Sequence, residues 1–136
     1  MKIVLDTNVL VSGLLKPYST SGLIVRQVAE GTIRIVYDSR ILVEYREVLK
    51  REKFDFDTEL VDILLNQIET EGLLVSGKPI KNKLPDPNDG PFLEVAHAME
   101  RIIIVTGNKK HFPEEVCAKI TVMEPTQFID YLSEQL

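Results

Sequence analysis

Short, unbroken apolar runs constrain the fold of this chain more than any other sequence feature. Lys2–Leu5 and Ile102–Val105 are such runs, each rich in β-branched residues and without polar alternation. This pattern is typical of strands buried on both faces, as in a parallel sheet. Thr32–Tyr37 predicts another strand and 120–123 a short last one, while 73–75 fits a short strand or an extended segment.

Amphipathic segments separate the predicted strands. Helical spacing, capping residues and Gly or Pro boundaries place helices at about 9–15, 21–30, 39–51, 58–71, 92–100 and 125–132. In the fourth of these we expect a buried face formed by Leu60, Ile63, Leu64, Gln67 and Ile68. Strands that alternate with helices indicate βαβ units, so we expect an α/β domain with helices on both faces of the sheet. The 136-residue length predicts one domain, 1–136.

Charge and cysteine content exclude several classes of protein. The chain has 21 acidic and 16 basic residues, a net charge of −5, so it does not hold nucleic acid by bulk positive charge. A partner that carries phosphate therefore needs a metal or a local basic patch. The single cysteine, Cys117, excludes an internal disulfide and a cysteine-based zinc cage, and we expect it to be a small buried apolar residue. No signal peptide and no membrane span are predicted, so we expect a cytoplasmic protein.

Acidic and polar residues follow the predicted strands. Asp6 follows the first strand, Asp38 the second, and Thr106–Asn108 the strand at 102–105. Asp86 and Asp89 lie in the loop that enters the next helix. Because the carboxyl ends of parallel strands share one edge of a sheet, we expect these side chains to converge there. Carboxylates that converge repel one another unless a cation holds them.

Each acidic position also has a purely structural interpretation. Asp6 fits an N-cap of the segment that begins at Thr7 or Asn8. Glu44 lies at the border of the apolar stripe of its helix, where it can face a cleft or simply flank the stripe, whereas Glu47 points nearly opposite. The segment 86–91 is also ordinary turn and helix-start sequence.

Two groups of basic residues have alternative interpretations as well. Lys78, Lys81 and Lys83 form either a solvated loop or a set of contacts to RNA phosphates. His111 lies in a turn close to Asn108, from which it can either reach the sheet edge or stay in the turn.

Four segments, in order along the chain, resemble the motifs of PIN-domain nucleases. They are Asp6–Ser12 (DTNVLVS), Glu44 on the helix after the second strand, Asp86–Glu94 (DPNDGPFLE) and Val105–Phe112 (VTGNKKHF). The resemblance spans nearly the whole chain, from residue 3 to about residue 123. It implies a three-layer α/β sandwich with a central parallel sheet and Mg²⁺- or Mn²⁺-dependent cleavage of RNA. For small members it also implies a toxin role beside an antitoxin, and homodimers.

The resemblance also assigns roles by position. Asp6, Glu44 and Asp89 match metal-binding carboxylates, and Asn8 and Thr106 match supporting polar positions. Two or three carboxylates leave coordination positions on a hard cation open for water and a phosphate, and the number of metals stays open at one or two.

Asn108 departs from the family pattern, in which this position is more often Asp. We expect Asn108 and Asp86 to be supporting residues. The departure keeps a rival hypothesis open, a catalytically weak PIN-like module that binds RNA or protein. Two other folds are excluded: a haloacid-dehalogenase-type site requires an acid at Asn8 and Thr at Leu10, and a phosphate-binding loop requires glycines earlier than Gly13.

Overall fold

A parallel sheet forms the centre of the molecule in the computed structural model, which describes residues 1–81, 83–117 and 119–135. Its strands are β1 (Lys2–Leu5), β2 (Arg34–Tyr37), β3 (Leu73–Leu74), β4 (Ile103–Val105) and β5 (Thr121–Met123). All neighbouring strands are parallel. The prediction of a parallel sheet built from short apolar strands is therefore confirmed. Position 82 of the predicted loop lies outside the described residues, as do positions 118 and 136.

The strand order β3-β2-β1-β4-β5 decides where a site can form. The chain first adds β2 and β3 on one side of β1, then returns to place β4 on the other side. Ile3 of β1 accordingly aligns with Ile35 on one side and Ile103 on the other. In open α/β sheets, a crevice opens beyond the carboxyl ends of the strands where the order reverses. Here that point lies between β1 and β4.

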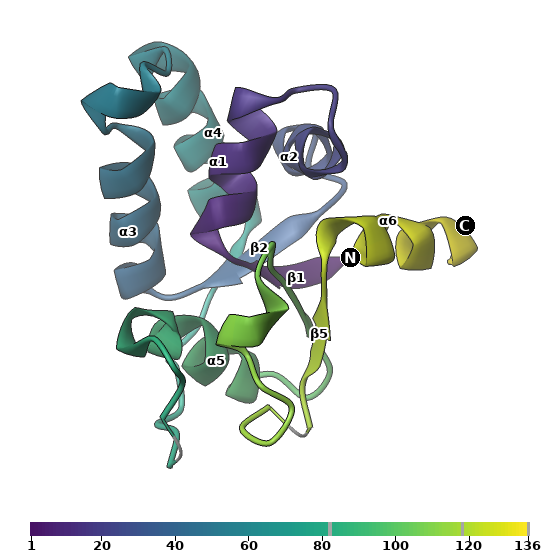
Figure 1. Cartoon of the computed structure of the whole chain (residues 1–136). Helices are drawn as coiled ribbons and strands as arrows, with labels where there is room; N and C mark the ends of the chain where they lie inside the picture. The colour runs from purple at the N-terminus through teal and green to yellow at the C-terminus, as the bar shows by residue number, and fades with distance from the viewer. Residues whose placement is uncertain (82, 118, 136) are drawn as a thin grey trace.

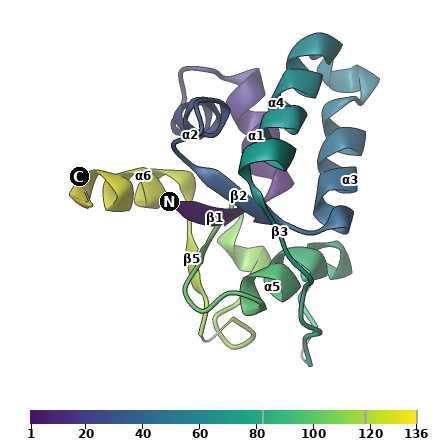
Figure 2. The same ribbon diagram turned by 180° about the vertical axis from the view of Figure 1, so that it is seen from behind.

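Helices cover both faces of the sheet, as Figures 1 and 2 show: α1 to α4 lie on one face and α5 on the other. The helices are α1 (Thr7–Leu15), α2 (Thr20–Ala29), α3 (Ser39–Leu49), α4 (Thr58–Glu71), α5 (Gly90–His97) and α6 (Pro125–Glu134). The last helix, α6, packs against α2. The predicted three-layer α/β sandwich is confirmed. No helix in the described part of the chain is long and apolar enough to cross a membrane.

Local sequence signals set several of the helix ends. Asp6, Ser19, Asp38 and Asp57 each accept a hydrogen bond from a backbone N–H in the first turn of a helix, which satisfies one of the donors that a helix start leaves free. Gly31, with φ of 82°, takes a left-handed conformation just after α2, where glycine is favoured.

The buried face predicted for α4 is wrong in part. Val61, Leu64, Leu65 and Ile68 are buried, whereas Leu60 and Ile63 are 63% and 64% exposed. Both sets of residues satisfy helical spacing, so the spacing alone does not select between them. The choice depends on α2 and α3, which pack against α4.

The described buried apolar residues form one cluster around the sheet. Ile3, Val4 and Leu5 of β1 are fully buried, as is Phe128 of α6. Cys117 is 3% exposed and carries a free thiol, which confirms its prediction as a buried residue. This core fixes the position of the carboxyl end of β1, which Asp6 follows directly.

Candidate functional site

A cleft opens at the carboxyl end of β1, bordered by α1, α3, the loop before α5 and the turn after β4. Figure 1 shows α1 and α3 side by side, with α5 across the sheet. The cleft has a volume of about 410 Å³, within the range of small-ligand sites, and is open to solvent. Its acidic lining residues are Asp6, Glu44, Asp86 and Asp89.

Asp6 has a structural and a site role at once. Its Oδ1 caps α1 by accepting a hydrogen bond from the backbone N–H of Asn8, at 3.4 Å. Its Oδ2 accepts a 2.7 Å hydrogen bond from the hydroxyl of Thr106, which follows β4. Burial raises the pKa of Asp6, and the Thr106 hydrogen bond offsets part of that rise. Asp6 can therefore cap α1 and belong to the cleft at the sheet edge at the same time.

Glu44 faces the cleft from α3. It is partly buried, whereas Glu47 on the same helix is exposed, as the helical spacing predicts. The hydroxyl of Thr7 donates a hydrogen bond to Oε2 of Glu44, and the buried Tyr45 hydroxyl donates to the backbone carbonyl of Leu5. These two bonds connect α3 to the end of β1. Burial raises the pKa of Glu44, and the Thr7 hydrogen bond lowers it in part.

Asp89 carries a buried oxygen without a hydrogen-bond donor. It ends the 3-10 turn Pro87–Asp89, immediately before α5, and is 8% exposed. Its Oδ2 is buried, and no described group donates a hydrogen bond to it. Nδ1 of His111 lies 3.0 Å from this oxygen without the geometry of a hydrogen bond. Burial and the charge of Asp6 raise the pKa of Asp89 to about 6.

A compact group of ligand atoms also lies in the cleft. One ligand atom each from Asp86, Asp89 and His111 lies within 4.8 Å of the others, close enough to hold a metal ion. His111 belongs to the short 3-10 turn Lys109–His111. The sequence left its position open, and the only signal was its place in the turn that follows β4.

Of the predicted supporting residues, Asn8 lines the cleft and Asn108 does not. Oδ1 of Asn8 accepts a 3.2 Å hydrogen bond from the backbone N–H of Gly107, which links α1 to the turn after β4. The backbone N–H of Asn108 donates to the Thr106 hydroxyl at 3.1 Å. The side chain of Asn108 is partly exposed, does not cap the following turn, and is not part of the cleft lining.

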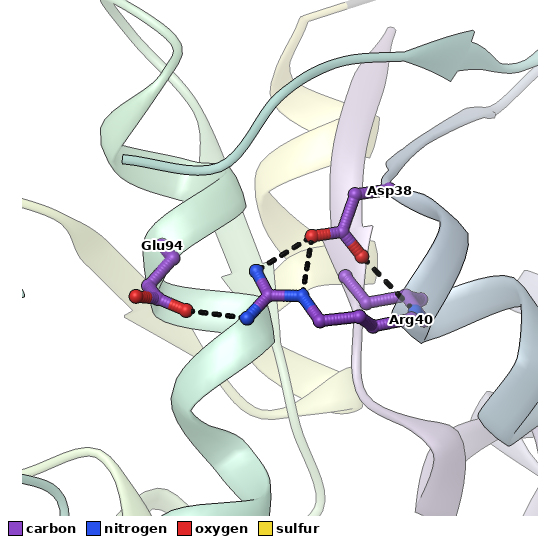
Figure 3. A network of polar contacts seen from close by, with 4 residues as sticks. Asp38, Arg40 and Glu94 are labelled. Atoms are coloured by element: carbon purple, nitrogen blue, oxygen red, sulfur yellow. Dashed lines mark hydrogen bonds and ion pairs between the residues drawn. The ribbon is translucent and has the colours of Figure 1, made fainter. Parts of the chain in front are cut away.

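Asp38 does not join the cleft, which corrects the expectation from the sheet edge. It caps α3 and pairs with Arg40 at 2.6 Å, and Arg40 also bonds Glu94 of α5 at 2.8 Å (Figure 3). The reason lies in the strand order, because Asp38 follows β2, on the side of β1 away from β4. Arg40 neutralises this carboxylate, so it needs no cation from solution.

The basic loop also lies apart from the acidic residues. Lys78, Lys81 and Lys83 are exposed, and none of them lines the cleft. The cations that do line it are Arg51 and, when protonated, His111. Thr7 and Arg51 were not predicted as site residues, because helical spacing does not reveal contacts between α1, α3 and the segment after α3.

Comparison with known proteins places this arrangement in a wider group. A family model described as PIN domain matches residues 2–110, which include every acidic residue of the cleft. Searches of curated proteins and of solved structures found no match.

Proposed function

This chain belongs to the PIN-domain family, which implies a nuclease-type function, and from this membership we propose that it hydrolyses phosphodiester bonds of RNA with Mg²⁺ or Mn²⁺. The observation that carries the proposal is the buried Oδ2 of Asp89, which has no described hydrogen-bond donor and has the imidazole of His111 3.0 Å away, in a cleft shared with Asp6 and Glu44. A buried anionic oxygen without a donor is costly unless a cation binds it.

The residues present fit a divalent cation. Three carboxyl groups with raised pKa values share one open cleft, and carboxylate oxygens are the ligands that Mg²⁺ and Mn²⁺ prefer. We propose Asp6, Glu44 and Asp89 as the metal-binding residues, with Asp86 and His111 beside them. When bound, the metal would activate a water molecule and offset the negative charge that grows on the phosphate.

The surrounding residues of the chain hold these carboxylates in place. Thr106 fixes one oxygen of Asp6, and Thr7 fixes one oxygen of Glu44. Asn8 ties the start of α1 to the turn that carries Thr106. Both oxygens of Asp6 thus accept a hydrogen bond, one oxygen of Glu44 does, and Oδ2 of Asp89 has no described donor. We propose Asn8 and Thr106 as supporting residues on this basis.

The test is cleavage of a labelled single-stranded RNA by purified protein with Mg²⁺, with Mn²⁺ and with EDTA. We expect cleavage that depends on the metal, and a loss of at least about 100-fold in Asp6→Asn, which keeps the size and the cap but not the charge. Asp38→Asn is the matched control, because Asp38 is also a buried aspartate after a strand but lies outside the cleft. Full activity in Asp6→Asn would refute the proposal.

A second candidate is a catalytically weak module that binds RNA or protein. The observation that favours it is Asn108, where an amide replaces the charge of the Asp that this position more often carries in the family. The same assay separates the two candidates. RNA binding without metal-dependent cleavage would support the module, and cleavage above the Asp6→Asn background would exclude it.

We further propose that the protein acts as the toxin of a toxin–antitoxin pair and forms homodimers. Val43, Leu60 and Ile63 on the neighbouring helices α3 and α4 are more than half exposed, which suits a protein partner. A small overlapping reading frame next to the gene would support the pairing, and growth arrest on expression, relieved in Asp6→Asn, would test it. The mass in solution tests the dimer.

A further inference from the structure

The rim of the acidic cleft carries a cation and an aromatic ring that the metal chemistry does not use. Arg51 lies just after α3, and Phe54 ends the 3-10 turn Glu52–Phe54. Both line the same cleft as Glu44 and Asp89. Burial raises the pKa of Glu44 and the charge of Arg51 offsets a small part of that rise, so the guanidinium lies within electrostatic range of Glu44.

We propose that Arg51 and Phe54 form a nucleotide subsite, in which Arg51 contacts a phosphate next to the one that is cleaved and Phe54 stacks an unpaired base. This inference rests on the proposed ribonuclease function and deepens it. It names the substrate as RNA that is single-stranded at the cleavage site.

The charge distribution of the cleft favours Arg51 as the phosphate contact. Among the described residues that line the cleft, it is the only one with a permanently cationic side chain, and four acidic residues surround the space. A phosphate that approaches such a site needs a positive charge besides the metal. The lysines of the 78–83 loop do not line the cleft and do not supply it.

The guanidinium of Arg51 is available for a new contact. Its side chain is 47% exposed, and its ion pair with Glu47 is long, at 3.6 Å, and lies at the surface. Exposed pairs of this kind contribute little, so a phosphate can replace Glu47 at small cost. The planar fork of an arginine also matches two phosphate oxygens at once.

Phe54 is held as a platform. Its ring stacks on that of Phe56 with 5.4 Å between the ring centres and 11° between the planes, and Phe56 packs against the core. Asp55, between them, has φ of 52°, a left-handed conformation uncommon for a residue other than glycine, and it bends the chain between the two rings. Phe54 itself is partly exposed, and the exposed Lys53 has its Nζ 5.0 Å from the centre of the ring, so a stacked base takes the place of this ammonium group.

A base can use this platform only when it is unpaired. In a duplex each base is already stacked and paired, whereas an unpaired base can turn onto an aromatic side chain. Stacking of one base on an aromatic ring strengthens binding by about 5- to 150-fold and depends weakly on base identity. We therefore expect a preference for single strands over duplexes, with little sequence selectivity from this subsite.

The test measures RNA binding in the full-length Asp6→Asn background, where cleavage does not interfere. The probes are a short single-stranded RNA with one 2-aminopurine, whose fluorescence falls when the base stacks, and a duplex that contains the same strand. Phe54→Leu keeps an apolar side chain but removes the ring, so we expect at least 5-fold weaker binding of the single strand and loss of the fluorescence change. Phe54→Tyr should retain both.

The phosphate contact is tested by salt titration. Arg51→Gln should weaken binding and reduce the slope of log affinity against log salt by about 0.7, the value for one phosphate on a single strand. Lys50→Gln is the matched control, because Lys50 precedes Arg51, pairs with Asp62 and does not line the cleft. It removes the same charge and should leave the slope nearly unchanged.

The outcomes distinguish the subsite from the nuclease function. If the unmodified protein cleaves RNA but Phe54→Leu and Arg51→Gln bind the single strand as tightly as the Asp6→Asn protein, the subsite is refuted and the proposed nuclease function is not. Equal affinity for single strand and duplex would refute the base platform in the same way. If the unmodified protein neither cleaves nor binds RNA, both proposals fall. If Phe54→Leu fails to fold, the test rests on the Asp6→Asn protein and on Phe54→Tyr in that background. If RNA binding quenches the fluorescence in neither of them, the stacking is refuted.

Discussion

Asp89 should destabilise the metal-free protein at neutral pH, so that Asp89→Asn makes the fold more stable. Asp89 is 8% exposed, and one of its carboxyl oxygens has no described hydrogen-bond donor. Burial and the charge of Asp6 raise its pKa from 3.8 to about 6. Because the pKa is higher in the folded than in the unfolded state, the folded state binds more protons between these values. The free energy of unfolding therefore falls as the pH rises from about 4 to about 6, and it stays lower above that.

The size of the effect follows from the same pKa. Each tenfold change in proton affinity corresponds to about 1.4 kcal/mol. A rise of the Asp89 pKa from 3.8 to about 6 therefore corresponds to about 3 kcal/mol in the free energy of unfolding. The cleft is open to solvent, which screens the charge, so we expect roughly 1–2 kcal/mol to be measured. Asn is neutral at all these pH values. Asp89→Asn should thus raise the free energy of unfolding by that amount at pH 7.5, or the melting temperature by roughly 4–8 °C. The gain should shrink towards zero near pH 4.

Urea unfolding in EDTA at pH 7.5 and pH 4.5 measures this difference. Asp38→Asn is a control in which the free energy of unfolding should change in the opposite direction. Asp38 is also buried, but it is paired with Arg40, so the loss of its charge should destabilise the protein by about 1–3 kcal/mol. Mn²⁺ at 100 times its dissociation constant should stabilise the unmodified protein by about 2.7 kcal/mol and stabilise Asp89→Asn far less. If Asp89→Asn lowers stability equally at both pH values, the charge of Asp89 is already compensated and the reasoning is wrong.

Three further predictions concern residues outside the cleft lining. Provided that the side chain of Asn108 faces Asp6 and Asp89, Asn108→Asp should tighten Mg²⁺ and Mn²⁺ binding and lower the metal concentration for half-maximal cleavage, whereas equal affinities in calorimetric titration would place Asn108 outside the site. If Lys78, Lys81 and Lys83 contact RNA phosphates, replacing all three should weaken RNA binding and flatten its salt dependence by at most about 0.7 for each lost contact; an unchanged slope would leave the loop a solvated surface. Arg40→Gln should cost about 1 kcal/mol in urea unfolding, because it removes the cation that bridges the carboxylates of Asp38 and Glu94, and no change would show that solvent replaces the bridge.

The sequence by itself determined the layers of the fold and the main candidates for the site. The unbroken apolar run Lys2–Leu5 has one stable environment, a strand covered on both faces, and the same holds for the run that becomes β4. Helix caps such as Asp57 act within a few residues, so they too can be recognised locally. Helical periodicity alone predicts the exposure of Glu47 and places Glu44 at the border of the apolar stripe, and the contact with Thr7 then holds Glu44 at the cleft.

The tertiary structure alone decided which side chains meet. Asp38 and Asp6 both follow strands, but only the strand order and the position of Arg40 separate the neutralised carboxylate from the one in the cleft. His111 reaches Asp89 from a turn after β4, and Phe54 reaches the rim from a segment after α3. Periodicity and capping are properties of neighbouring residues. Contacts between distant segments depend on how whole helices pack, and two faces of one helix, as in α4, can satisfy the same local pattern.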